Sequence, residues 1–282
     1  MVRTFLAVIM AAFLLAGCSQ GNVTEDNSLK QYFDAQGVNG CFGMFDNGQG
    51  HFTIYNLHRY RDSSYLPAGT FDILQSLIGV QTGVVKDDSA LIVNGVALKI
   101  DHTAPLSGQM LPDSSKCSSP LITLTDAFRH SCPFAFQNLA RRIGKDTLKK
   151  WIDSLGYGNK DISSDVFWMD NHLTITSDEQ LGLVKKLYFD QLPFFPRSQK
   201  LVREMMLMEG NSNYQLSYKT GTGTRKDGHA FTWYIGWIEE NKNPYFFVLN
   251  LDAAGAGTDL EAKGLSILKD ILKKQGFLQG KK

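Results

Sequence analysis

The order of strand-like and helix-like segments constrains the fold of this chain more than any other feature of its sequence. Two short apolar or β-branched runs lie near its beginning, at 40–45 and 51–55, and Asp46-Asn47-Gly48 between them is a strong hairpin signal. Further strand-like runs lie near the end of the chain, at 215–219, 230–239 and 245–251. Strands at both ends with helices between them predict an α+β fold: an antiparallel sheet from both chain ends, flanked by helices, with an inserted helical subdomain.

The helices of this prediction follow from apolar spacing and from stop signals. Gly144 and Gly156 each follow a helical pattern directly, which is typical of a helix end. The stretch Ser177-Asp178-Glu179-Gln180 has the form of a capping box and predicts a helix beginning there. The expected helices cover residues 71–83, 124–130, 134–143, 147–155, 177–187 and 260–275.

Composition limits the classes of partner. The chain has 282 residues with 29 Lys+Arg against 28 Asp+Glu, a formal net charge of +1, and 43% apolar residues. This balance excludes a disordered polyelectrolyte and offers no electrostatic ground for binding nucleic acid. No internal repeat of 20 to 50 residues is visible, so a solenoid or propeller is disfavoured.

The first residues predict export. Residues 5–15 form an apolar run after Arg3, of the length of a signal-peptide core and too short to span a bilayer. Leu15-Ala16-Gly17-Cys18 resembles the lipobox of bacterial lipoproteins, which implies a signal peptide at 1–17 and a lipidated Cys18. The alternative is an ordinary signal peptide with a chance cysteine. We expect a tether over 18–30, a folded domain over 31–282, and an exported lipoprotein anchored to a membrane and facing the periplasm or the cell exterior.

Cysteines and histidines give no sign of a metal site or cofactor. Three cysteines remain after Cys18, an odd number, and no two of them have metal-binding or redox spacing. We interpret Cys41, Cys117 and Cys132 mainly as small buried apolar residues, and a bridge between Cys117 and Cys132 stays open. The six histidines show neither a His-Glu-x-x-His motif nor close pairing, so we expect no metal.

Two short segments carry candidate chemistry. Lys219-Thr220-Gly221 lies between two strand-like runs, where it forms either a glycine-rich turn or a Lys-Thr-Gly strand that holds a substrate carboxylate. Ser131 lies at a junction between helical patterns, where it is either a helix N-cap or a proton shuttle. The residues alone leave both alternatives open.

Neighbouring motifs add a family resemblance. From Gly40 to Asp252 the chain resembles class D β-lactamases, the oxacillin-hydrolysing type of penicilloyl-serine transferase. The matching segments, in the family's order, are residues 65–72, 76–78 and 81–86, Tyr157-Gly158-Asn159, Phe167-Trp168, Lys219-Thr220-Gly221 and residues 233–237. The resemblance implies catalytic positions at Gly69, Asp72, Ser131 and Lys219, and substrate-binding positions at Phe71, Trp168, Thr220, Gly221 and Thr222.

The largest departure is in the motif that performs the family's chemistry. Where the family has Ser-x-x-Lys, this chain has Gly69-Thr70-Phe71-Asp72. The family uses the serine as acylating nucleophile and the lysine, carboxylated on its amine, as base. Glycine has no nucleophile and aspartate cannot be carboxylated. One residue along a helix turns a side chain by about 100°, so the Thr70 hydroxyl should point away.

Two further departures concern ligand recognition. The family's Ser-x-Val is Ser131-Cys132-Pro133 here, and proline removes a backbone donor and stiffens the loop. The family's arginine for the drug carboxylate is missing from residues 253–265, where Lys263 is the only cation. Lysine does not reproduce a bidentate guanidinium, so the role is not transferred to Lys263.

Two functional hypotheses of different class follow. In the first, the chain binds β-lactam or peptidoglycan-like ligands without acylation, as a pseudoenzyme or an inactivated variant of a hydrolase. In the second, it hydrolyses β-lactams by an altered mechanism that uses Ser131, Lys219 and Asp72. Loss of both members of Ser-x-x-Lys favours the first hypothesis, and in both the ligand is a small molecule.

Overall fold

The protein is built around a seven-stranded sheet. The computed structural model describes residues 21–93, 117–253 and 259–280. All neighbouring strands of the sheet are antiparallel except β1 and β3, which confirms the antiparallel sheet expected from both chain ends. In sheet order the strands are β1 (Val23–Glu25), β3 (His51–Tyr55), β2 (Asn39–Asp46), β11 (Asn243–Ala253), β10 (Ala230–Glu240), β9 (Gln215–Thr224) and β8 (Leu207–Gly210).

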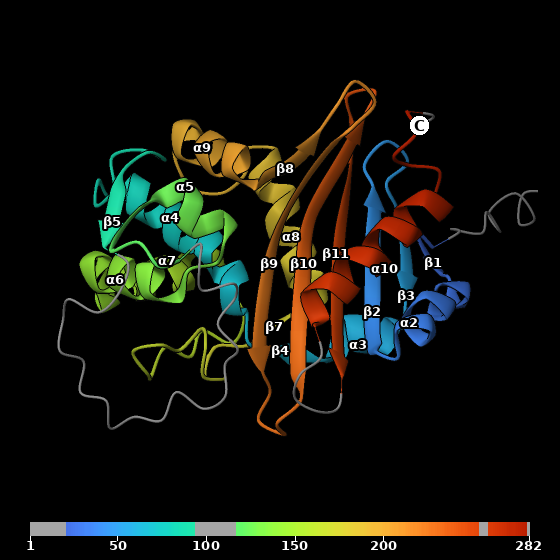
Figure 1. The fold of residues 1–282 in the computed structure, drawn as a ribbon, viewed down its shortest axis with the longest axis horizontal. Coiled ribbons are helices and arrows are strands. Elements are labelled where there is room, and N and C mark those ends of the chain that lie inside the picture. Colours follow the sequence, from blue (N-terminus) through green and yellow to red (C-terminus); the bar gives the residue numbers. More distant parts are fainter. Residues whose placement is uncertain (1–20, 94–116, 254–258, 281–282) are drawn as a thin grey trace, which may run out of the picture.

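Helices cover both faces of this sheet and form a separate group beyond its β9 edge (Figure 1). The helices are α2 (Lys30–Gln36), α3 (Leu57–Asp62), α4 (Asp72–Gln81), α5 (Leu124–Arg129), α6 (Pro133–Ile143), α7 (Lys145–Leu155), α8 (Ser177–Tyr188), α9 (Pro196–Met206) and α10 (Leu260–Lys274), with 3-10 turns η1 (Asn27–Leu29) and η2 (Ala68–Phe71). Two small sheets pair β4 (Ser64–Tyr65) with β7 (Ile175–Thr176), and β5 (Leu91–Val93) with β6 (Leu121–Thr123). In Figure 1 the predicted helical subdomain contains α4, α5, α6 and α7.

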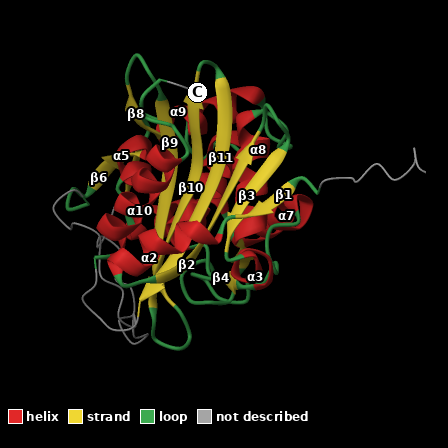
Figure 2. Cartoon of the chain, turned by 90° about the vertical axis from the view of Figure 1, so that its right-hand side faces the viewer, coloured by secondary structure: helices red, strands yellow, loops and turns green. Residues whose placement is uncertain are grey.

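Alternation along β10 explains why the sheet is covered on both faces. Trp233, Ile235 and Trp237 belong to the larger apolar core, which contains the helical subdomain and α8. Tyr234 and Ile238 point to the other face and pack with residues of α2 and α10. Because side chains alternate along a strand, one strand supplies both cores. Figure 2 shows α10 and α2 lying across the face of β10 and β2.

One helix cap and one boundary differ from those expected. The capping box of α8 is formed by Thr176 and Glu179, one residue before the predicted Ser177: Thr176 Oγ1 accepts from the Glu179 amide, and Glu179 accepts from the Thr176 amide. The segment assigned to a tether is also packed, because β1 pairs with β3 and Leu29 is fully buried. Folded structure therefore begins before residue 31.

The cysteines differ from the main interpretation as well. Cys117 and Cys132 form a disulfide, whereas Cys41 is free and buried as expected. Cys132 is the N-cap of α6, so the bridge ties the start of that helix to the segment before β6.

The predicted signal peptide and Cys18 lie outside the described residues. Within 21–93, 117–253 and 259–280, no helix is both long enough and apolar enough to cross a membrane.

Candidate functional site

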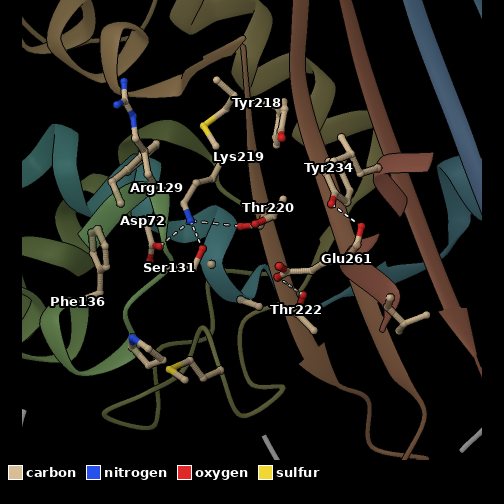
Figure 3. Close-up of a pocket in the computed structure, with 18 of the residues that line it drawn as sticks. Asp72, Arg129, Ser131, Phe136, Tyr218, Lys219, Thr220, Thr222, Tyr234 and Glu261 are labelled. Carbon is tan, nitrogen blue, oxygen red and sulfur yellow. Dashed lines mark hydrogen bonds and ion pairs between the residues drawn. The ribbon is translucent and has the colours of Figure 1, made fainter. Parts of the chain in front are cut away.

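A cleft of about 590 Å³ lies between the helical subdomain, β9 and the beginning of α10. Its lining brings together residues that are distant in sequence: Gly69 and Asp72 from η2 and α4, Ser131 after α5, Trp168, and Lys219 from β9. Figure 3 shows Lys219 at its centre, with Asp72 and Ser131 on one side and Thr220 on the other. Every catalytic position implied by the sequence is therefore in one cavity.

Lys219 joins the polar groups of the cleft. Its side chain is 2% exposed, and its Nζ lies 3.0 Å from Asp72 Oδ2. Nζ also donates to Ser131 Oγ and, at 3.3 Å, to the carbonyl oxygen of Thr220. The short aspartate reaches the ammonium directly, so no bridging water is needed between them.

The electrostatics of this pair are dominated by burial. Burial raises the pKa of Asp72 to about 7, and the charge of Lys219 only partly opposes that rise. The ring of Phe128 lies 5.1 Å from Lys219 Nζ and presents a face that favours a cation. The side-chain nitrogen of Lys219 therefore lies among Asp72, Ser131 and the ring of Phe128.

Ser131 is positioned by the turn between α5 and α6. Its φ is +49°, in the left-handed region, and its amide donates to the Phe128 carbonyl. Cys132 occupies the N-cap position of α6, so the alternative of Ser131 as a cap is wrong. Pro133 is the first residue of that helix, where the missing donor would have had no helical partner.

Gly69 lines the cleft close to Ser131 and β9. A Cβ built on Gly69 would lie 2.8 Å from the Thr220 carbonyl oxygen and 3.0 Å from Ser131 Oγ. Residue 69 therefore faces Ser131 and β9 directly, and the space for a side chain there is partly closed.

Thr70 and Phe71 point away from the cleft. The Thr70 hydroxyl donates to the Pro67 carbonyl at 2.7 Å and accepts from Gln180 Nε2 at 2.7 Å, as the helical rotation predicted. Phe71, expected to touch substrate, is fully buried behind the cleft. It stacks on Trp168 with ring centroids 5.6 Å apart, and Trp168 itself lines the cavity.

The Lys-Thr-Gly segment lies within β9, so the turn alternative is wrong. Among the described strands, residues 218–224 pair only with β10, because β8 pairs no further than Ser217. Thr220 and Thr222 line the cleft. Gly221, expected to bind substrate, instead faces η2, where a Cβ would lie 2.7 Å from the Pro67 carbonyl oxygen.

The prediction from sequence missed five polar residues of the lining: Arg129, Tyr218, Tyr234, Asp259 and Glu261. Glu261 is in the first turn of α10, within residues 253–265, from which the family's arginine is missing. Its Oε1 accepts from Thr222 Oγ1 at 2.8 Å. Lys263 points elsewhere and donates to the Gln36 carbonyl at 2.6 Å.

Comparisons with known proteins agree with this arrangement. Residues 21–274 match the model of the penicillin binding protein transpeptidase domain. The chain is 33% identical to β-lactamase OXA-48 of Klebsiella pneumoniae, over 90% of each protein. It is 30% identical to β-lactamase OXA-10 of Pseudomonas aeruginosa, over 99% of this chain and 100% of the relative.

A solved structure shows the same fold. The class D β-lactamase FUS-1 (OXA-85) of Fusobacterium nucleatum subsp. polymorphum superimposes with a TM-score of 0.78 at 28% identity, covering 91% of this chain and 100% of that one. The α+β fold, the cleft beside a Lys-Thr-Gly strand and the relatives agree, and the chain belongs to the class D serine β-lactamase family.

Proposed function

We propose that this chain binds β-lactam or peptidoglycan-like ligands in its cleft without forming an acyl-enzyme. The observation that carries the proposal is Gly69, which lines the cleft from η2, three residues before Asp72, and has no side chain. The family resemblance puts the acylating serine at this position. A base cannot activate a hydroxyl that is absent.

The second part of the family's chemistry is replaced as well. Asp72 occupies the position of the base lysine, and its carboxylate faces Lys219 Nζ at 3.0 Å. The carboxyl group of Asp72 is therefore occupied by a contact with Lys219. Asp72 therefore supports a preserved cleft more than it supports a replacement base.

One observation favours hydrolysis by an altered mechanism as a second candidate. Ser131 lines the cleft and contacts Lys219 Nζ, so a serine and a lysine are adjacent at the ligand site. This contact alone does not supply a general base, because a lysine ammonium has no acceptor with which to take the serine proton. The non-covalent function is therefore the better supported of the two.

Intact-mass analysis after incubation with penicillin G separates the candidates. Non-covalent binding predicts no added drug mass, together with a saturable ligand signal in a ligand-observed NMR titration. A stoichiometric adduct on the Ser131 peptide, absent from Ser131→Ala, would establish the second candidate. Absence of both adduct and binding would refute the proposed function.

We also propose that Cys18 is lipidated after removal of residues 1–17, which would anchor the protein to a membrane outside the cytoplasm. The lipobox-like Leu15-Ala16-Gly17-Cys18 supports this proposal. Metabolic labelling with an alkyne fatty acid should mark the wild-type chain and should not mark Cys18→Ser. Equal labelling of the two would refute it.

A further inference from the structure

The end of the cleft beside Thr222 carries negative charge. Glu261 lines it and accepts a hydrogen bond from Thr222 at 2.8 Å. Asp259, the N-cap of α10, lines the same cavity. Figure 3 shows Glu261 reaching from α10 to Thr222 on β9. A group bound beside Thr222 would therefore meet a carboxylate.

Two strands hold Glu261 in this position. Its carbonyl oxygen accepts from the Tyr234 hydroxyl of β10 at 2.7 Å, and Thr222 Oγ1 is 3.0 Å from Thr232 Oγ1. Burial and, after it, the charge of Glu261 raise the pKa of Tyr234, so that hydroxyl keeps its proton and remains a donor. Glu261 is thus held through its side chain by β9 and through its backbone by β10.

Nearby positive charge does not cancel the negative charge of Asp259 and Glu261 at this end of the cleft. The N-terminus of a helix carries about half a positive charge, whereas Asp259 and Glu261 each contribute a full negative one. Figure 3 shows Lys219 turned toward Asp72 and Ser131, on the other side of Thr220 from Glu261. Arg129 donates to the carbonyl oxygens of Met205 and Leu207, and Figure 3 shows it on the opposite side of Lys219 from Glu261.

We infer that Glu261 selects the charge of the ligand: the Thr222 end of the cleft takes a cationic group, such as the ammonium of an amine-bearing β-lactam-like or peptide-like ligand, in preference to a carboxylate. The inference rests on the proposed function, because it concerns the same cleft. A carboxylate there would lie against a like charge, and like charges across an interface disfavour binding.

The test uses three charge states of one scaffold: penicillin G (anionic), its methyl ester (neutral) and its diethylaminoethyl ester (cationic). Their dissociation constants for the full chain are measured at low ionic strength by ligand-observed NMR. We expect affinity to rise in that order, with about fivefold between successive members, the size of an incompletely buried charge pair. The preference should shrink at 0.5 M salt because screening weakens it.

Two variants and a control assign the preference to Glu261. Glu261→Gln keeps an acceptor for Thr222 and removes the charge, so the three affinities should agree within about twofold. Glu261→Arg should reverse the order. Asp270→Asn removes the same charge further along α10, at a residue outside the cleft lining, and should leave the wild-type order intact.

The results distinguish the charge selection, the role of Glu261 and the proposed function. Equal affinities of the wild type for all three compounds would overturn the charge selection and leave the proposed function standing. A cationic preference that persists in Glu261→Gln would overturn the role of Glu261. Binding of none of the three would overturn both the inference and the proposed function.

Discussion

The pair of Asp72 and Lys219 shows how one residue changes both the chemistry and the pH response of the cleft. The carboxyl of Asp72 is buried, and its pKa in the folded protein is about 7 against 3.8 for an ordinary aspartate. The folded state therefore holds a proton that the unfolded chain has already released between these two values. Stability must fall as pH rises through this interval.

The direction of this pH dependence of stability gives a prediction for Asp72→Asn. Relative to that variant, the wild type should lose free energy of unfolding as pH rises from about 4 to about 7, by at most about 4 kcal/mol, and change little above pH 7. Urea denaturation of both proteins at intervals of pH measures the difference. A wild type that gains stability over Asp72→Asn in this interval would mean that Lys219 outweighs burial and lowers the pKa of Asp72.

Gly69 gives a second prediction at this scale, because a side chain there would meet the backbone of β9. A Cβ there would lie 2.8 Å from a backbone carbonyl oxygen, which yields less readily than a flexible side chain. Gly69→Ala should lower the free energy of unfolding by about 1 to 3 kcal/mol, the usual cost of overpacking.

Gly182→Ala is the matched control, because a Cβ on this α8 glycine meets nothing within 4 Å. Its helix should gain up to about 1 kcal/mol. Equal effects of the two changes in urea titrations would contradict this account.

At the scale of elements, the disulfide positions the turn that carries Ser131. It links Cys117 to Cys132, the residue after Ser131, across a separation of 15 residues. Closing a loop of this length lowers the entropy of the unfolded chain, which stabilises the folded state by about 3 kcal/mol. We predict that dithiothreitol lowers the free energy of unfolding of the wild type by roughly this amount.

The double variant Cys117→Ser with Cys132→Ser is the control for this effect. It should match the reduced wild type in stability and should not respond further to dithiothreitol. Cys41 is free, so Cys41→Ala should retain the full response to the reductant. A wild type with the same urea midpoint in both redox conditions would show that the bridge contributes nothing.

Elements with strong local signals could be predicted from sequence. The hairpin at Asp46-Asn47-Gly48 and the long strands β10 and β11 need only alternation and turn residues to be recognised. α8 begins at Ser177 as expected, but its cap is one residue earlier, because Thr176 and Ser177 are both good N-caps with an acceptor three residues later. The three-residue β1 has no local signal, and its pairing with β3 is a tertiary contact.

At the scale of the whole molecule, family motifs located the cleft but did not determine which side chains line it. Gly69, Asp72, Ser131 and Lys219 meet as the motifs implied, whereas Phe71 packs behind Trp168. Glu261 was missed because its role depends on how α10 crosses β9, and Thr222 lies 39 residues earlier in the chain. Such a contact has no local sequence pattern.

The fold around the cleft therefore matches the family, and the departures that remove the family's nucleophile and base are at residues 69 and 72. Nitrocefin turnover by the wild type and by Gly69→Ser with Asp72→Lys, with and without bicarbonate, tests this claim most directly. We predict no turnover by the wild type, and measurable turnover by the folded double variant, stimulated by bicarbonate because its new lysine must be carboxylated. Neither single change should suffice, since nucleophile and base act as a unit. Nitrocefin turnover by the wild type that is lost in Ser131→Ala would contradict the account.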